Sequence, residues 1–353
     1  MKLNAKIYEV KTNSNLHLTQ VNCCVCGSDD ATLIGKGEDF EYHTSPDIFL
    51  AMRCNSCGLV YLNPRPAISE VEKIYPSTYH AYNFSKEKFG SVYKIRSRIE
   101  ARRLLNHCHN LPDDARILDI GCGDGFHLNL LRKFGKESWS LEGIDVDKYA
   151  VKAAARLGLK VHLGILEEIE LPEENYDLIF MIMSIEHFEK PDVVLYAAHR
   201  LLRKGGRIVI VTDNTDSIDF RIFKRAHWGG YHFPRHWNLF NRRSLSKLAQ
   251  KTGFEVEHLT TIMSPVNWVY SIHNTLVDWR KPKWLINRFT LKSIISLSFF
   301  TAFDFILQKF GKGALLQVTL KKACEMNSIK SLNAGRKDEF GHRVEDKIPD
   351  KKN

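Results

Sequence analysis

The chain has 353 residues, of which 44% are hydrophobic and 11% aromatic, so it can bury a full core and is typical of a globular protein. Four of the eight cysteines stand in two CxxC pairs, which favours metal binding in a reducing compartment over a disulfide framework, and we expect a cytoplasmic protein. The formal net charge of +10 would suit nucleic acid, a phosphorylated substrate or a membrane surface, but the basic residues form no single tract.

Four cysteines near the amino terminus have the spacing of a metal site. Cys23 and Cys26 form one CxxC turn, and Cys54 and Cys57 form a second one further along the chain. A glycine follows each pair, which suits a tight turn that points backbone N–H groups at sulfur. Four thiolates can converge on one Zn²⁺ and leave no open position for catalysis. We therefore expect a structural zinc ribbon over residues 21–66, with a redox-active CxxC as the alternative.

A segment rich in tyrosine follows the cysteines. Tyr75, Tyr79 and Tyr82 could line a ligand mouth or pack the ribbon on the next domain, and the sequence leaves both roles open. Residues 91–109 have helical periodicity and a basic face. We expect residues 67–112 to form a helical connector.

The stretch RILDIGCGDG, from Arg116 to Gly125, combines a buried strand with a glycine-rich turn. Its continuous apolar run is typical of a parallel strand that is covered on both faces. Glycines at alternate positions let the backbone come close to a ligand, and a helix pattern begins at Phe126. The dinucleotide fingerprint GxGxxG does not fit, because its third glycine would fall at Phe126. The pattern is DxGxGxG, beginning at Asp119.

The DxGxGxG pattern resembles the first motif of the class I S-adenosylmethionine (SAM) methyltransferases. The CxxC pairs and the segment GLVYLNPRP also resemble the branch of that family that carries a zinc ribbon, many members of which act in sugar and secondary-metabolite pathways. The resemblance covers roughly residues 21–265. It implies SAM as the cofactor and methyl transfer, of the EC 2.1.1 class, as the reaction.

Strand and helix patterns alternate after Arg116, which predicts an α/β protein with a doubly wound parallel sheet. The resemblance implies a Rossmann-like sheet of seven strands whose last strand is antiparallel. We expect the strands at 117–120, 139–145, 160–164, 176–184, 207–212, 254–261 and 315–320. We divide the chain into a lead-in (1–20), the zinc ribbon (21–66), the connector (67–112), a SAM-binding core (113–264), a helical lid with the last strand (265–323) and a charged, disordered tail (324–353).

The resemblance also implies which residues bind the cofactor. Asp119 would hydrogen-bond the ammonium of SAM, and Asp145 would accept the two ribose hydroxyls, with capping of the next helix as its alternative role. Adenine would pack on Ile165 and Leu166, and Ser184 would lie near the reacting centre. The predicted cofactor set is Asp119, Gly121, Cys122, Gly123, Gly125, Asp145, Val146, Leu166 and Ser184.

A hydroxyl, amine or acidic-carbon acceptor needs a base, and histidine suits that role near neutral pH. The segment HWGGYHFPRHWNLF leaves the carboxyl edge of the predicted sheet, so it should face the acceptor. We take His232 and His236 as candidate bases and Tyr231 as a further catalytic candidate, and expect Arg235 to bind an anionic group. Packing and helix capping are the alternative roles for these side chains.

The dipeptide Glu186–His187 resembles the EH element that follows the fourth strand in many relatives. In the small-RNA and ubiquinone-pathway O-methyltransferases, the form ExxEH supplies metal ligands. Met183 stands here in place of the first Glu, so that ligand set is incomplete. We expect the pair to support the pocket instead.

The stretch 265–314 before the last strand is unusually long. It contains three tryptophans and several basic residues, and five apolar side chains then fall on one helical face: Ile295, Phe299, Phe303, Ile306 and Phe310. The apolar part is too short to span a bilayer, which takes roughly 20 residues. Two interpretations stay open, a lid or dimer helix over the site and a peripheral membrane contact through residues 284–310 on the inner face of the membrane.

The sequence therefore predicts a SAM-dependent methyltransferase with structural Zn²⁺ that acts on a small-molecule or sugar/glycan acceptor through a His base. RNA methylation, with the ribbon recognising RNA, is the alternative, although no compact basic tract or RNA motif is present. A SAM-binding protein without turnover is a further alternative. The acceptor, the methylated atom and the oligomeric state are left open.

Overall fold

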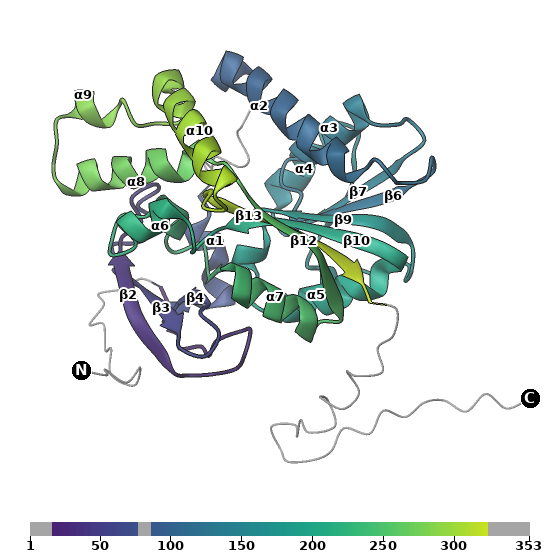
Figure 1. Ribbon diagram of the computed structural model, residues 1–353, viewed down its shortest axis with the longest axis horizontal. Coiled ribbons are helices and arrows are strands. Elements are labelled where there is room, and N and C mark those ends of the chain that lie inside the picture. Colours follow the sequence, from purple (N-terminus) through teal and green to yellow (C-terminus); the bar gives the residue numbers. More distant parts are fainter. Residues whose placement is uncertain (1–15, 77–85, 324–353) are drawn as a thin grey trace, which may run out of the picture.

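The computed structural model describes residues 16–76 and 86–323 (Figure 1). Tyr79, Tyr82 and the predicted tail at 324–353 lie outside the described residues, as does most of the predicted lead-in.

A seven-stranded sheet forms the centre of the molecule, in the order β12-β13-β10-β9-β6-β7-β8. The pairs from β10 through β9, β6 and β7 to β8 are all parallel, whereas β13 is antiparallel to both β10 and β12. The predicted α/β fold, with an antiparallel last strand, is confirmed. The strands are β6 (Arg116–Ile120), β7 (Ser140–Asp145), β8 (Lys160–Leu163), β9 (Tyr176–Ile182), β10 (Leu202–Asp213), β12 (Phe254–Ile262) and β13 (Leu315–Lys322).

Both faces of this sheet are covered, which is why its strands are apolar throughout. Successive side chains of a strand point to opposite faces, so Phe180 of β9 packs with α2 and α3, while Ile179 and Met181 pack with α5 and α7. Figure 1 shows these two helix layers on either side of the sheet. The covering helices are α2 (Lys86–His107), α3 (Phe126–Phe134), α4 (Lys148–Arg156), α5 (Pro191–Leu201) and α7 (Arg242–Lys251).

The cysteine-bearing segment forms a second, antiparallel sheet beside the first. Its strands are β2 (Ala31–Gly37), β3 (Phe49–Cys54) and β4 (Val60–Leu62), and β11 (Asn238–Leu239) joins it from the far part of the chain. A two-stranded pair, β1 (Leu18–Thr19) with β5 (Arg65–Pro66), and the short helices η1 (Ile68–Glu70) and α1 (Val71–Ile74) complete this part. Because β11 pairs with β4, the small sheet holds the segment that follows β10 in place.

The long stretch before β13 contains α8 (Pro265–Asp278), α9 (Lys283–Ile286) and α10 (Ile294–Lys309). Trp268 of α8 stacks on Phe300 of α10 with ring centroids 5.7 Å apart. The buried Asp304 carboxylate accepts hydrogen bonds from Ser264 N, Ala314 N and the Trp268 indole, which fixes α10 to α8 and to the start of β13. Within residues 16–76 and 86–323, no helix has both the length and the apolar character needed to cross a membrane.

Candidate active site

The glycine turn after β6 leaves an open surface at the carboxyl edge of the sheet. Gly121, Gly123 and Gly125 all have positive φ, a conformation that favours glycine. A Cβ on Gly121 would lie 2.5 Å from the Cβ of Ser184, whereas a Cβ on Gly123 would have no neighbour within 4 Å. Ser184 also donates to the Ile120 carbonyl, so its side chain fixes the turn from below and Gly123 faces open space.

Asp119 is a buried carboxylate that lacks a counter-charge. Neither of its oxygens has a hydrogen-bond partner among the described residues, and His127 Nδ1 lies 4.0 Å from Oδ2. Burial, reinforced by the nearby charge of Asp145, raises the pKa of Asp119 to about 7. Burying a carboxylate without partners costs free energy of folding, and a bound ammonium group would supply the missing hydrogen bonds and counter-charge.

Asp145 ends β7 and holds the glycine turn. Its Oδ2 accepts from Gly123 N at 2.8 Å and its Oδ1 accepts from Asp147 N at 2.9 Å. Asp147, and not Asp145, caps α4, because its carboxylate accepts from Tyr149 N and Ala150 N. The capping role considered for Asp145 is therefore wrong, and both of its oxygens keep a lone pair for a ligand hydroxyl.

Glu186, His187 and His236 meet beyond the carboxyl ends of β9 and β10. One ligand atom from each of the three lies within 4.8 Å of the others, so the group could hold a divalent cation. His236 Nδ1–H donates to the Gly230 carbonyl at 2.9 Å and lies 3.1 Å from Asp213 Oδ2. With Nδ1 protonated, Nε2 carries the lone pair.

The surroundings of these three side chains set their protonation. Burial lowers the pKa of His236, but its contacts with Asp213 outweigh burial and raise the pKa overall. Burial also holds the pKa of His187 well below its usual range, and it raises the pKa of Glu186 to about 7. His187 Nδ1 lies 3.1 Å from the Arg235 carbonyl and 2.9 Å from the Tyr75 hydroxyl. His187 is thus a neutral ring, and donation from its Nδ1–H to the Arg235 carbonyl leaves the lone pair on Nε2.

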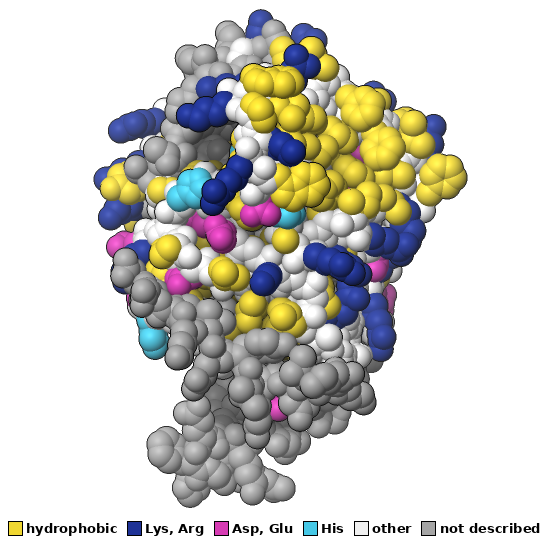
Figure 2. Space-filling model, turned by 90° about the vertical axis from the view of Figure 1, so that its left-hand side faces the viewer, with side chains coloured by type: hydrophobic (Ala, Val, Ile, Leu, Met, Phe, Trp, Pro, Cys, Tyr) yellow, Lys and Arg dark blue, Asp and Glu magenta, His cyan; other side chains and the backbone are white. Residues whose placement is uncertain are grey.

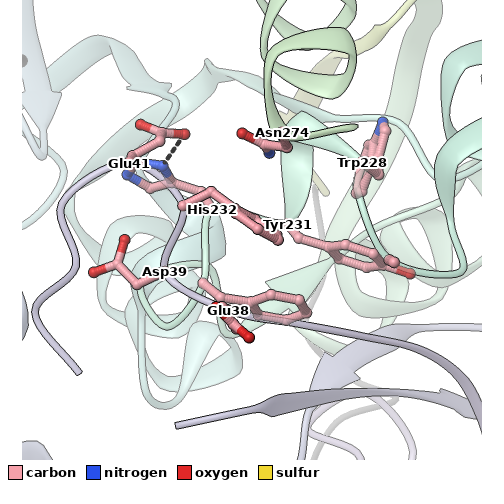
Figure 3. A pocket seen from close by; sticks show the side chains of 10 residues that line it. Glu38, Asp39, Glu41, Trp228, Tyr231, His232 and Asn274 are labelled. Atoms are coloured by element: carbon pink, nitrogen blue, oxygen red, sulfur yellow. Dashed lines mark hydrogen bonds and ion pairs between the residues drawn. The ribbon is translucent and has the colours of Figure 1, made fainter. Parts of the chain in front are cut away.

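A second pair, His232 with Glu41, lines a small cleft between the β2–β3 loop and α8 (Figure 3). His232 Nδ1 lies 2.9 Å from Glu41 Oε1, and the rings of His232 and His236 are 4.9 Å apart. Asn274 of α8 completes the cleft, and Asn267 of the same helix donates to Asp213. The His236 ring contacts the rings of both His187 and His232. These three contacting rings extend from the carboxyl edge of the sheet to this cleft.

The four predicted zinc ligands also come together. The Sγ atoms of Cys23 and Cys57, and those of Cys26 and Cys54, are 3.4 Å apart, and all four sulfurs lie within 4.8 Å of one another. Zn–S bonds of about 2.3 Å in a tetrahedron would place sulfurs about 3.8 Å apart. The donor set therefore fits one Zn²⁺.

Comparisons with known proteins agree with this geometry. Residues 93–259 match the model of a methyltransferase domain family. Relatives include a sterol 24-C-methyltransferase of Candida albicans, 21% identical over 56% of this chain and 55% of its own, and a ubiquinone biosynthesis O-methyltransferase of Maricaulis maris, 29% identical over 36% and 52%. The chain thus spans about half the length of these two relatives. A solved SAM-dependent methyltransferase from Thermotoga maritima is also similar, with 19% identity, a TM-score of 0.46, and coverage of 70% of this chain and 99% of its own.

Residues 93–259, just under half of the chain, are similar to a methyltransferase domain, and one relative is named as a probable SAM-dependent methyltransferase. The domain match and the relatives named as methyltransferases support an enzyme of the methyltransferase class. The orphaned Asp119, the open turn at Gly123 and the available lone pairs of Asp145 fit an ammonium, a close-packed ligand backbone and a ribose diol. The residues present therefore suit SAM.

The prediction that the Leu166 side chain packs on adenine is wrong. The Leu166 side chain, in η3 (Leu166–Glu168), is 6% exposed and packs in the core, so it cannot stack on a base. Val146 and Ile165 are 60% and 44% exposed. Gly164 N donates to the Asp145 carbonyl, so their two loops lie side by side. Cys122 is buried too and can offer only its backbone.

Two residues that were predicted to contact the methyl acceptor, Tyr231 and Arg235, make structural contacts within the protein instead. The Tyr231 hydroxyl donates to the Lys224 carbonyl, and its ring stacks on Phe233 and points away from the Glu41–His232 pair (Figure 3). Arg235 is fully buried and makes a two-point ion pair with Asp39, 2.8 and 3.1 Å long. Its charge is thereby neutralised, so the expectation that it binds an anionic group is wrong.

Several side chains of the site were absent from the prediction. Asp213 positions His236, Glu41 positions His232, and Asn267 fixes Asp213 from α8. Asp213 ends the fifth strand of the parallel run, a position that could have marked it. Glu41 and Asn267 carry no local signal, because only the fold brings them to the site.

Proposed function

We propose that the enzyme methylates a small-molecule or sugar acceptor, with His236 as the general base. The observation that carries the proposal is the His236–Asp213 contact, which leaves Nε2 as the proton acceptor beside the cofactor edge. The acceptor lone pair forms a bond to the methyl carbon as the carbon–sulfur bond breaks, and the acceptor proton passes to His236 Nε2. Histidine in this role typically contributes about 10²–10⁴-fold.

For the cofactor, we propose Asp119 on the ammonium group and Asp145 on the ribose hydroxyls, with Val146 and Ile165 against adenine. Support comes from the buried, unpartnered oxygens of Asp119 and from the exposure of the two apolar side chains. Gly121, Gly123 and Gly125 supply the backbone turn, and Ser184 positions it through Gly121. SAM bound in this way supplies the electrophilic methyl group.

The acceptor cleft favours a small ligand over RNA. Glu38 and Glu41 line it together with His232, and the third acid there, Asp39, is paired with Arg235. A polyanionic backbone gains affinity from clustered cations, and acids at the cleft would oppose it. His232, held by Glu41, is the second candidate base in this part of the site.

We propose a structural role for zinc at the four cysteines. Cys54 ends β3, the strand between β2 and β4, and β4 pairs with β11. Four thiolates leave no position for a reacting group. Zinc would therefore act on the acceptor cleft through the β2–β3 loop and β11, and not on the chemistry itself.

The test uses methyl-labelled SAM and a host-cell extract that is separated into RNA, lipid and soluble small-molecule fractions. His236→Ala should lower label transfer by about 10²-fold or more, and added imidazole should restore part of it by filling the space of the missing ring. The matched control is His227→Ala on the same segment, since the His227 side chain contacts Asp278 on α8 and is not among the side chains that line the cleft. Label confined to RNA, or full transfer by His236→Ala, would contradict the proposal.

Treatment with a chelator distinguishes the general-base role of His236 from the binding of a cation by Glu186, His187 and His236. With zinc retained at the cysteines, removal of other cations should leave label transfer unchanged. A requirement for added Mg²⁺, Mn²⁺ or Zn²⁺ would instead assign the three side chains as ligands.

A further inference from the structure

The outward side of α10 is a large exposed apolar surface (Figure 2). Ile295, Phe299 and Phe310 are 85%, 62% and 75% exposed, and Phe303 and Ile306 lie on the same side of the helix. Trp284, in α9, is 64% exposed and adds to the exposed apolar side chains of this region. We name these six residues the outer face of α10. Contiguous exposed apolar side chains on this scale mark a surface that contacts an apolar medium or a partner.

The distribution of polar groups on α10 is inverted relative to an ordinary surface helix. Two of its polar residues, Ser296 and Asp304, are buried, and both make hydrogen bonds inside the protein. Phe300 packs inward on Trp268, whereas Ile295, Phe299 and Ile306 are exposed. The buried hydrogen bonds fix the helix in place. No element among the described residues covers its outer face.

Cations flank this outer face. Residues 265–314 hold seven Lys and Arg but only two Asp, of which Asp304 is buried and Asp278 contacts His227. Arg288 lies 5.6 Å from the Trp284 ring and Lys309 lies 5.0 Å from the Phe305 ring. Figure 2 shows dark-blue side chains beside the yellow ones on this face. An apolar centre with cations and tryptophan at its edges is the pattern of a helix that lies in the headgroup region of an anionic bilayer.

The charges also argue against self-association through this face. A two-fold contact brings the same surface of two copies together, so the flanking cations of each would oppose those of the other. An anionic lipid surface would neutralise them instead. The charge complementarity therefore favours lipid as the occupant.

The outer face and the acceptor cleft share one helix. α8 packs on α10 through Trp268, and it also supplies Asn274 to the cleft and Asn267 to Asp213. A membrane-bound α10 would therefore hold the cleft close to the lipid headgroups.

We propose that the outer face of α10 docks on an anionic lipid bilayer, and that the methyl acceptor is an amphiphilic molecule carried by that bilayer. The proposal of docking is supported by the exposed residues of α10 alone, whereas the proposed acceptor class rests on the proposed function. The helix lies along the membrane and does not cross it, in line with its 16 residues.

The test is co-sedimentation of the full-length, zinc-loaded protein with vesicles of phosphatidylcholine alone or with added phosphatidylglycerol. The wild type should bind the anionic vesicles about tenfold more strongly than the neutral ones, and high salt should weaken the binding. The double variant Ile295→Glu/Phe299→Glu should lose at least about tenfold of it. Phe134→Glu on α3, also an exposed aromatic, is the matched control and should bind like the wild type.

Light scattering and S-adenosylhomocysteine (SAH) binding are measured on the same samples. Failure of the wild type to sediment, or a dimer that the double variant converts to a monomer without any vesicle binding, would overturn the docking. Vesicle binding with label transfer only to water-soluble acceptors would overturn the acceptor class. Vesicle binding without SAH binding would overturn the proposed function and leave the docking intact.

Discussion

The proposed cofactor end and the proposed acceptor end of the site are built in different ways. At the cofactor end, Asp119, Gly123 and Asp145 belong to two successive strand–turn units, and the Asp145 carboxylate accepts hydrogen bonds from backbone N–H groups. At the acceptor end, side chains pair with side chains across long stretches of chain, as in Asp39 with Arg235, which are 196 residues apart.

The two ends therefore depend on different parts of the fold. The turn at the cofactor end depends on the strand that precedes it, on Asp145 at the end of β7 and on Ser184. The acceptor end needs the small cysteine-bearing sheet, β11 and α8 all in place, because each supplies or holds one of its side chains. Damage to the small sheet should therefore abolish turnover before it abolishes cofactor binding.

Removal of the proposed zinc should have the largest effect. Cys54→Ser should lose the metal, lower the thermal midpoint by roughly 10 °C or more and abolish label transfer, because structural zinc provides folding free energy directly. SAH binding at low temperature should fall far less. Zinc content, thermal unfolding and SAH titration provide the measurements. Equal loss of SAH binding would show that the two ends are not separable.

Breaking the buried Asp39–Arg235 pair should have the next largest effect. Asp39→Asn leaves the guanidinium buried without its counter-charge, which typically costs about 3–5 kcal/mol of unfolding free energy. Denaturant unfolding measures this cost. The exposed pair of Lys136 with Asp113 offers the control, and Asp113→Asn should leave the unfolding midpoint unchanged.

The same ion pair predicts an acid transition. Burial raises the pKa of Asp39, but Arg235 outweighs burial and brings it down to about 2 from the ordinary 3.8. The contribution of the pair to stability is therefore complete above the ordinary pKa and is lost as the pH falls toward about 2. In Asp39→Asn, this part of the pH dependence should be absent, and its persistence would contradict the assignment.

A smaller effect should appear in the pH dependence of cofactor binding. Since the pKa of Asp119 is raised to about 7, the free enzyme carries a proton there below that pH. The ligand ammonium favours the carboxylate, so SAH affinity should rise by up to about tenfold per unit as the pH increases toward 7 and then level off. Calorimetry in buffers of different ionisation enthalpy should detect the released proton. Asp119→Asn should show a flat profile and weaker binding.

The sequence predicted the glycine turn and the strands beside it because that information is local. An apolar strand, three glycines and an acid after the next strand determine the turn and its carboxylates within about thirty residues. The failure at Leu166 is also local, since a shift of one residue in a short turn exchanges the buried side chain for the exposed Ile165. The four cysteines were predicted for the same reason, as spacing alone sets their convergence.

The acceptor end could not be predicted to the same depth. Arg235 looks available in the sequence, and only the β2–β3 loop, which brings Asp39 against it, shows that its charge is neutralised. Tyr231 looks like a catalytic group until its hydroxyl is found on the Lys224 carbonyl. Such contacts depend on how distant elements pack, and neither periodicity nor spacing carries that information.

The central claim is tested most directly by titrating SAH into the wild type, Asp145→Ala and His236→Ala. The account predicts one binding site in the wild type, affinity lower by about 10²-fold in Asp145→Ala through the loss of charged hydrogen bonds, and affinity within about threefold of the wild type in His236→Ala. An unchanged affinity in Asp145→Ala, or an equal loss in both variants, would contradict the division of the site into a cofactor end and an acceptor end.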